Sequence, residues 1–326
     1  MSDSAQTTPH VTALQDARLM RLATYASLGV AVALVALKTG AWAITGSVSM
    51  LSTLVDSLLD AGASLINLLA VYHALQPADR EHRWGHGKAE ALAGLGQAAF
   101  IAGSGLFLLL EATGRIVTPR PIEQSAWGIA VMVIAIAATL ALVLFQVMVA
   151  RRTRSLAIRS DSVHYQTDLI SNLAVIGSLI LSGWFSIHYA DPVVALGIVA
   201  YMAWGSIGIA RQALDELMDR ELPDADRQKI REIAQRHPAV KSVHDLRTRS
   251  SGRQNFIQIH LEMDRDLTLV EAHEISDEVM YNVEAAFPNS EVLIHQDPEG
   301  VEERRDVLAS PGRTEAAMDA AKTGTQ

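Results

Sequence analysis

Apolar residues fall into six long blocks over the first two thirds of the chain, at roughly 20–44, 47–75, 90–113, 124–150, 161–185 and 191–214. A helix needs about 20 apolar residues to cross a bilayer core about 30 Å thick, and each block is long enough. Short polar segments separate the blocks. The pattern therefore predicts a membrane α-helical bundle of six transmembrane helices over residues 18–215, preceded by a polar N-terminal tail at 1–17.

After Arg220 the pattern becomes that of a soluble domain. Residues 224–237 and 267–287 have the spacing of amphipathic helices, and the second places Val270, Ile275, Val279 and Val283 on one apolar face. The strings VKSVHDLRTRSS, FIQIHLEM and SEVLIHQD suit strands. The order αββαβ predicts an α+β domain over residues 216–300, with two helices on one face of a three-stranded sheet. Residues 301–326 are polar and aperiodic, so we expect them to be disordered.

Basic residues are concentrated in alternate connections between the blocks. They precede the first block and lie between the second and third and between the fourth and fifth, at Arg18, Arg21, Arg80, Arg83, Lys88, Arg151, Arg152, Arg154 and Arg159. The positive-inside rule then places both termini in the cytoplasm, which makes the α+β domain cytoplasmic. No cleavable signal pattern is visible at the start of the chain.

Composition restricts the chemistry. The chain has no cysteine, which excludes disulfides and thiolate ligands, so a metal site would use imidazole and carboxylate. The net charge is −9, largely from the C-terminal part, and this argues against a nucleic-acid partner.

Two apolar blocks each carry a pair of polar residues one helical turn apart, Asp56 with Asp60 and His164 with Asp168. Residues at i and i+4 share one helix face, so each pair points two ligand groups in the same direction. A charge inside a membrane costs about 2.5–3.5 kcal/mol on insertion scales, which favours a functional role. Two facing pairs suit a four-coordinate Zn²⁺ site. The alternative is polar contact between helices with Lys38 as the counter-charge, but one lysine cannot neutralise three carboxylates.

Further candidate ligands lie outside the apolar blocks. Asp79, His82 and His86 are close in sequence between the second and third blocks and can converge if the segment turns, as Gly85 and Gly87 would allow. In the soluble part, His260 lies on an expected strand and His244 just before another. His295 and Asp297 alternate onto one face of a third strand. From the residues alone, solvated surface histidines remain an alternative in both places.

The two intramembrane pairs, the six expected spans and the αββαβ domain resemble the cation diffusion facilitator family, most of all its bacterial zinc/iron branch. The resemblance runs from about Arg18 to Asp297 and includes the strings PADREHRWGHGKAEALA, HDLRTRSSG, FIQIHLEM and IHQDP. Members are homodimeric antiporters of the bacterial inner membrane that export divalent metal in exchange for protons. Their cytoplasmic domain has a metallochaperone-like fold.

The resemblance also implies roles for individual residues. The transport site would consist of Asp56, Asp60, His164 and Asp168, and a loop site of Asp79, His82 and His86. The cytoplasmic sites would use His244, His260, His273, His295 and Asp297. A lysine–aspartate interlock near the dimer interface would use Lys88 and Asp219. Arg80 departs from the pattern, because relatives often have an acidic residue beside Asp79.

We therefore expect a homodimeric secondary transporter and no enzyme. It would carry Zn²⁺, with Fe²⁺, Cd²⁺ and Co²⁺ as further substrates, and its proton-coupling group would be His164, whose unperturbed pKa lies near neutral pH. Zn²⁺ would be both substrate and regulator, with no catalytic cofactor. Its partners would be divalent metal ions, protons, membrane lipid and a second copy of the chain.

Three alternatives stay open at this point. A membrane-bound metal sensor or scaffold would bind metal without transporting it, and a passive channel would ignore a pH gradient. An intramembrane aspartyl protease would have no need for His164, and the Gly-x-Gly-Asp string of the best-known such enzymes is absent.

Overall fold

The computed structural model describes residues 9–46, 48–117, 126–185 and 190–301. The chain forms two compact units, one up to Asp219 together with residues 251–253, the other from residues 220–250 and from 254 onward. Residues 302–326, most of the segment expected to be disordered, lie outside the described residues, as do residues 1–8 of the expected N-terminal tail.

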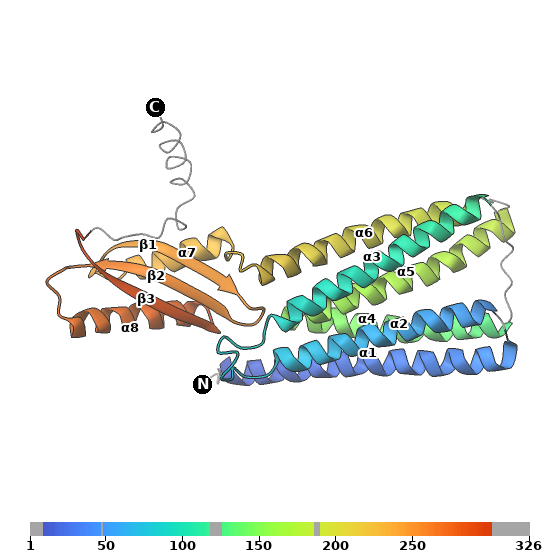
Figure 1. The fold of residues 1–326 in the computed structure, drawn as a ribbon, viewed down its shortest axis with the longest axis horizontal. Coiled ribbons are helices and arrows are strands. Elements are labelled where there is room, and N and C mark those ends of the chain that lie inside the picture. Colours follow the sequence, from blue (N-terminus) through green and yellow to red (C-terminus); the bar gives the residue numbers. More distant parts are fainter. Residues whose placement is uncertain (1–8, 47, 118–125, 186–189, 302–326) are drawn as a thin grey trace, which may run out of the picture. The chain divides into compact units, whose positions relative to one another are not determined.

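The first unit is a bundle of long helices (Figure 1). They are α1 (Pro9–Thr45), α2 (Val48–Ala74), α3 (Ala89–Val117), α4 (Ala126–Thr153), α5 (Leu156–Phe185) and α6 (Ala190–Leu217). In the described part of the chain, α1, α2, α3, α4 and α6 each contain a stretch long and apolar enough to cross a membrane. The expected six-helix bundle is confirmed, and α5 differs from its neighbours in composition.

Helix α5 packs against each of the other five helices of the bundle. Its buried positions include polar side chains, among them Asp161, Ser162, His164 and Thr167. These groups lower its hydropathy, and contacts with neighbouring helices replace contacts with lipid. Buried polar residues inside a bundle are typical of the pathway for an ion or substrate.

Helix α1 begins at Pro9, well before the expected start near residue 20. Its first turns are polar and are held by the end of α4. The Arg152 guanidinium donates hydrogen bonds to Asp16 Oδ1 and Gln15 Oε1, each at 3.1 Å. Because these side chains provide partners for a polar helix end, the helix extends beyond its apolar block.

The second unit has the expected order αββαβ. Its elements are α7 (Asp224–Gln235), β1 (Val240–Ser250), β2 (Asn255–Met263), α8 (Leu269–Ala286) and β3 (Ser290–Pro298). The sheet order is β1-β2-β3, with β1 antiparallel to β2 and β2 parallel to β3. Helix α8 is the crossover that a parallel strand pair requires.

The two faces of β2 differ in chemistry because side chains alternate along a strand. Ile257, Ile259, Leu261 and Met263 are buried in one core with residues of α7 and α8, including Ile230, Ala234, Val279 and Val283. His260 belongs to the alternate set, so it lies on the face opposite the helices. On α8 the expected apolar face holds for Val279 and Val283, and Ile275 packs against the core. Val270 was wrongly included, since it is exposed in the first turn of α8.

Candidate metal sites

The structure brings together one residue of α2 and two of α5 inside the helical bundle. His164 Nε2 lies 3.1 Å from Asp60 Oδ1 and 3.6 Å from Asp168 Oδ2. One ligand atom from each of the three residues lies within 4.8 Å of the others, and we call this group the intramembrane cluster. The helical spacing of His164 and Asp168 explains why both face α2.

The intramembrane cluster has an exposed and a buried side. His164 is almost fully buried, and Asp60 and Asp168 are partly exposed. Asp168 Oδ2 is itself buried and accepts no hydrogen bond. An orphaned carboxylate oxygen that faces an imidazole nitrogen is an available ligand atom, because a buried polar group normally has a partner.

Asp56, the fourth predicted transport-site residue, lies one turn before Asp60 on α2 but outside the three-residue cluster. The Lys38 ammonium group donates to Ser57 Oγ at 2.7 Å and to the Thr53 carbonyl oxygen at 3.0 Å, which ties α1 to α2.

Sequence reasoning missed a polar layer behind the intramembrane cluster. Asp161 is completely buried on α5 and accepts a hydrogen bond of 2.6 Å from the amide of Gln146 on α4. Ser64 Oγ of α2 lies 3.0 Å from Ser27 Oγ of α1 and 2.8 Å from the Tyr165 hydroxyl of α5. These bonds connect α5 to α1, α2 and α4, and they fix the helix face that carries His164.

A single signal could have revealed Asp161. It is a charged residue one helical turn before His164, within the same apolar block. A charge at that depth requires a partner, although the identity of Gln146 as that partner depends on how α4 and α5 pack.

The connection between α2 and α3 brings its three predicted ligands together, and we call them the loop cluster. Asp79 Oδ1 lies 3.4 Å from His82 Nδ1, and Asp79 Oδ2 lies 3.3 Å from His86 Nε2. Gly85 has a φ of +78°, which supplies the expected bend. The His82 amide N–H donates to Asp79 Oδ1 at 2.6 Å and keeps the pKa of Asp79 below its ordinary value.

Three histidines form a row across the sheet of the second unit. His244 is paired in register with His260, and His260 with His295. All three contact the buried carboxylate of Asp297, whose Oδ2 lies 3.1 Å from His244 Nε2 and 2.9 Å from His260 Nδ1. Asp297 Oδ1 lies 2.6 Å from His295 Nδ1. His244, His260 and Asp297 offer ligand atoms within 4.8 Å of one another, and we call these three the sheet cluster.

Two further residues of the second unit carry candidate ligand groups. His273, predicted as a cytoplasmic ligand, is 68% exposed on α8 and lies 3.6 Å from Asp277 of the same helix, outside the cluster. Asp245 was not predicted. It has a φ of +45° next to an irregularity in the β1–β2 register, and its Oδ2 lies 3.7 Å from His260 Nε2.

Lys88 and Asp219 form an ion pair of 3.0 Å within one chain. The Lys88 ammonium also donates to the Leu217 carbonyl oxygen at 3.3 Å, at the end of α6. The pair therefore joins the segment before α3 to the end of α6.

A helical membrane bundle with carboxylate and imidazole groups between its helices is the architecture of a transporter for cations. The family model of the cation efflux transmembrane domain matches residues 24–218, and that of the cation efflux protein cytoplasmic domain matches residues 222–299. The chain belongs to the cation efflux family, the cation diffusion facilitators, and it is a membrane transporter rather than an enzyme.

Two relatives of similar length agree with this assignment. A protein of Klebsiella pneumoniae subsp. pneumoniae named cation-efflux pump FieF is 49% identical over 87% of this chain and 94% of its own length. The protein of the same name from Cronobacter sakazakii is 49% identical over 86% of this chain and 93% of its own length. A solved structure of CzrB in its Zn form is 35% identical, covers 26% of this chain and 99% of that chain, and has a TM-score of 0.25.

Proposed function

We propose that the protein exports a divalent metal ion, Zn²⁺ above all, from the cytoplasm in exchange for protons. The observation that carries the proposal is the intramembrane cluster of Asp60, His164 and Asp168. It combines one nitrogen and two carboxylate ligands, and two of its three residues lie on α5, the helix that contacts every other helix of the bundle.

The donor set limits the choice of metal. Imidazole together with carboxylate suits Zn²⁺, Fe²⁺, Co²⁺ and Cd²⁺, whereas Mg²⁺ and Ca²⁺ prefer oxygen ligands alone. The chain has no cysteine, so soft thiolate coordination does not contribute. Zn²⁺ accepts a four-coordinate tetrahedral site without an electronic penalty. Asp56, one turn from Asp60 on α2, would supply the fourth ligand after a small movement of its side chain or helix.

The geometry of a single atom supports the proposal of proton coupling. His164 Nε2 faces Asp60 Oδ1 and Asp168 Oδ2 at 3.1 and 3.6 Å. A proton on this nitrogen is donated to Asp60 Oδ1, and a metal ion would need the same nitrogen lone pair. Metal ligands must be deprotonated, so proton binding and metal binding exclude each other there. Metal loading on the cytoplasmic side releases a proton, and protonation on the outer side releases the metal.

The other two clusters would bind metal outside the helical bundle, one of them as a regulatory site. The exposed loop cluster of Asp79, His82 and His86 is placed to bind metal outside the bundle. In the second unit, His244, His260 and Asp297, with His295 beside them, would bind regulatory Zn²⁺. His273 is exposed on α8, outside this site of its own chain. It would therefore join a regulatory site only as the His273 of a second chain.

The working form would be a homodimer in the bacterial inner membrane, with both termini in the cytoplasm. The distribution of basic residues supports this orientation. The match to the family's cytoplasmic domain and the similarity to the FieF relatives support the proposal that this chain has the same architecture as those transporters. In the dimer, the Lys88–Asp219 pair would stiffen the ends of α3 and α6 next to the interface.

The test is Zn²⁺ uptake into proteoliposomes of the purified protein, with and without an imposed pH gradient. Uptake that rises with the gradient supports a proton-coupled exporter. Equal uptake under both conditions would indicate a channel. Zn²⁺ binding without uptake would indicate a membrane-bound sensor or scaffold.

A further inference from the structure

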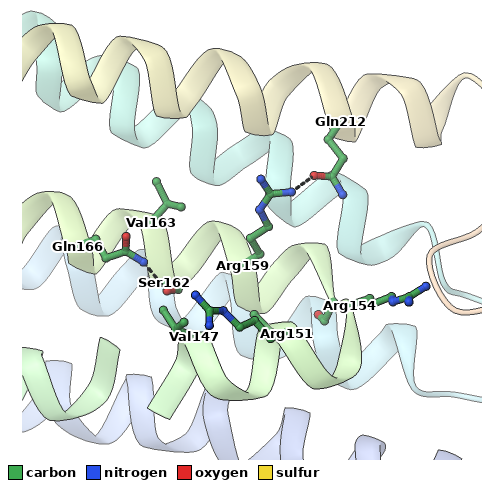
Figure 2. Close-up of a pocket in the computed structure, with 10 residues that line it drawn as sticks. Val147, Arg151, Arg154, Arg159, Ser162, Val163, Gln166 and Gln212 are labelled. Carbon is green, nitrogen blue, oxygen red and sulfur yellow. Dashed lines mark hydrogen bonds between the residues drawn. The ribbon is translucent and has the colours of Figure 1, made fainter. Parts of the chain in front are cut away.

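A cavity of about 370 Å³ opens between the ends of α4, α5 and α6, apart from the three metal-ligand clusters. Its polar lining includes Arg151, Arg154, Arg159, Gln166 and Gln212. Figure 2 shows Arg159 of α5 reaching to Gln212 of α6, where its Nη1 donates to Gln212 Oε1 at 2.5 Å. Gln166 donates to Ser162 Oγ at 2.9 Å on the same side of α5. The volume is within the range of small-ligand sites, about 300–1,000 Å³.

The positive charge of this cavity is not neutralised. Over the described ranges of the chain, Arg151, Arg154 and Arg159 form no ion pair with a carboxylate. Arg152 lies between them in sequence and provides the contrast, because it pairs with Asp16 at 3.1 Å. Arg151 and Arg159 bring two guanidinium groups to the cavity, which favours an anion, and their planar donor pattern fits phosphate oxygens.

The backbone at Arg154 adds a second observation. This residue follows the last turn of α4 with a φ of +55°, and its amide N–H donates to the Ala150 carbonyl oxygen at 2.9 Å. Glycine is the residue favoured at such a helix end, because other residues are strained in this conformation. The turn places the Arg154 backbone at the rim of the cavity, and Figure 2 shows the Arg154 side chain extending away from Arg151 and Arg159.

The apolar part of the lining distinguishes between sources of phosphate. Val147, Ala150 and Val163 supply the apolar part of the cavity wall, and Val147 and Ala150 belong to the apolar stretch of α4, Ala130–Thr153. A free inorganic anion gains nothing from such a wall, whereas the glycerol and first acyl carbons of a lipid do. Basic cavities between membrane helices at the bilayer surface are suited to anionic headgroups.

We propose that this cavity binds a phosphate group, and that its source is the headgroup of an anionic phospholipid. The site goes beyond metal transport and does not depend on it. Ser162, Val163 and Gln166 lie on α5 on either side of His164, so the bound lipid contacts the helix that carries two residues of the intramembrane cluster.

The first experiment measures retention of phosphatidylglycerol by the full-length protein in mixed micelles, using native mass spectrometry. The variant Arg151→Gln/Arg159→Gln is compared with the matched control Arg152→Gln, which removes one neighbouring charge outside the cavity. We expect affinity to fall at least about fivefold for each cavity arginine removed, and little change in the control. If the cavity variant and the control lost the same amount of phosphatidylglycerol retention, the effect would come from surface charge in general, and the proposed site would be wrong.

Two further measurements decide the source of the phosphate and guard against misfolded variants. Millimolar inorganic phosphate should leave phosphatidylglycerol retention by the wild type unchanged, whereas full competition would overturn the assignment to lipid. A photoactivatable phosphatidylglycerol should label peptides within residues 147–166 of the wild type. Labelling confined to other segments would overturn the proposal without any variant.

Discussion

His164 Nε2 and Asp60 Oδ1 lie 3.1 Å apart, although the two residues are separated by more than a hundred positions in the chain. The contact joins α2 to α5, whose buried positions include several polar side chains. It places a nitrogen ligand and an oxygen ligand within reach of one ion. The same two atoms are also at hydrogen-bonding distance from each other. The proposed competition between proton and metal depends on this pair.

The Asp161–Gln146 pair should stabilise the bundle cooperatively. Either single substitution, Asp161→Ala or Gln146→Ala, leaves a buried polar group without its partner and should cost about 1–3 kcal/mol. The double variant should be less destabilised than the sum, by a coupling energy of about 0.6–1.7 kcal/mol. Thermal unfolding of the detergent-solubilised protein measures all three. Strict additivity would mean that the hydrogen bond of 2.6 Å contributes nothing.

The sheet cluster should set the metal dependence of transport. His260→Ala removes the histidine at the centre of the row and should raise the zinc concentration for half-maximal transport, about 10-fold or more, while the maximal rate changes less. His237→Ala is a matched control, because His237 pairs with Glu278 outside the row. The measurement is initial transport rate against zinc concentration.

The same titration with His273→Ala decides the role of that residue. Within one chain it lies outside the sheet cluster, so we expect no shift in the concentration dependence. A shift as large as that of His260→Ala would require a metal site shared between two chains. An unchanged curve for His260→Ala itself would make the second unit purely structural.

The loop cluster should respond to the cation beside it. Arg80 is exposed next to Asp79, and Arg80→Asp should tighten zinc binding at this cluster by up to about fivefold, the range of exposed charge pairs. Asp79→Asn should abolish zinc binding at the loop cluster, because the Asp79 carboxylate contacts both histidines. Isothermal titration in an Asp60→Asn/Asp297→Asn background isolates the loop cluster. Identical binding curves for both variants would exclude it as a metal site.

Helix α8 should lose stability in acid through its N-terminal cap. The Thr268 backbone N–H and hydroxyl donate to Glu271 Oε2, each at 2.8 Å, and they lower the pKa of Glu271. Because the pKa of Glu271 is lower in the folded state, its ionised form stabilises the fold at pH values above the unfolded-state pKa, about 4.3 for glutamate. This stabilisation disappears as the pH falls through the folded-state pKa. Thr268→Ala should cost about 1 kcal/mol at neutral pH and less in acid. Hydrogen exchange of α8 amides in the full-length protein measures this, and a pH-independent difference would contradict it.

Local periodicity predicted much of the fold and part of the site. The i, i+4 spacing placed His164 and Asp168 on one helix face, and strand alternation placed His295 and Asp297 on one sheet face. The contacts that depend on helix packing were not predictable, such as Gln146 with Asp161 and Lys38 with Ser57. The same holds for Asp245, whose approach to His260 depends on an irregularity in strand register. Helix α1 began earlier than expected because side chains of α4 satisfy its polar end.

The most direct test follows zinc and protons together in proteoliposomes, with a zinc dye and a pH dye in the lumen. For the wild type, we expect zinc to enter the lumen while protons leave it. Asp60→Ala should abolish both fluxes, and Asp56→Ala should do the same if Asp56 is the fourth ligand. His164→Ala should weaken zinc flux or separate it from proton flux. Full, proton-coupled zinc flux through the Asp60→Ala protein would contradict the intramembrane cluster as the transport site.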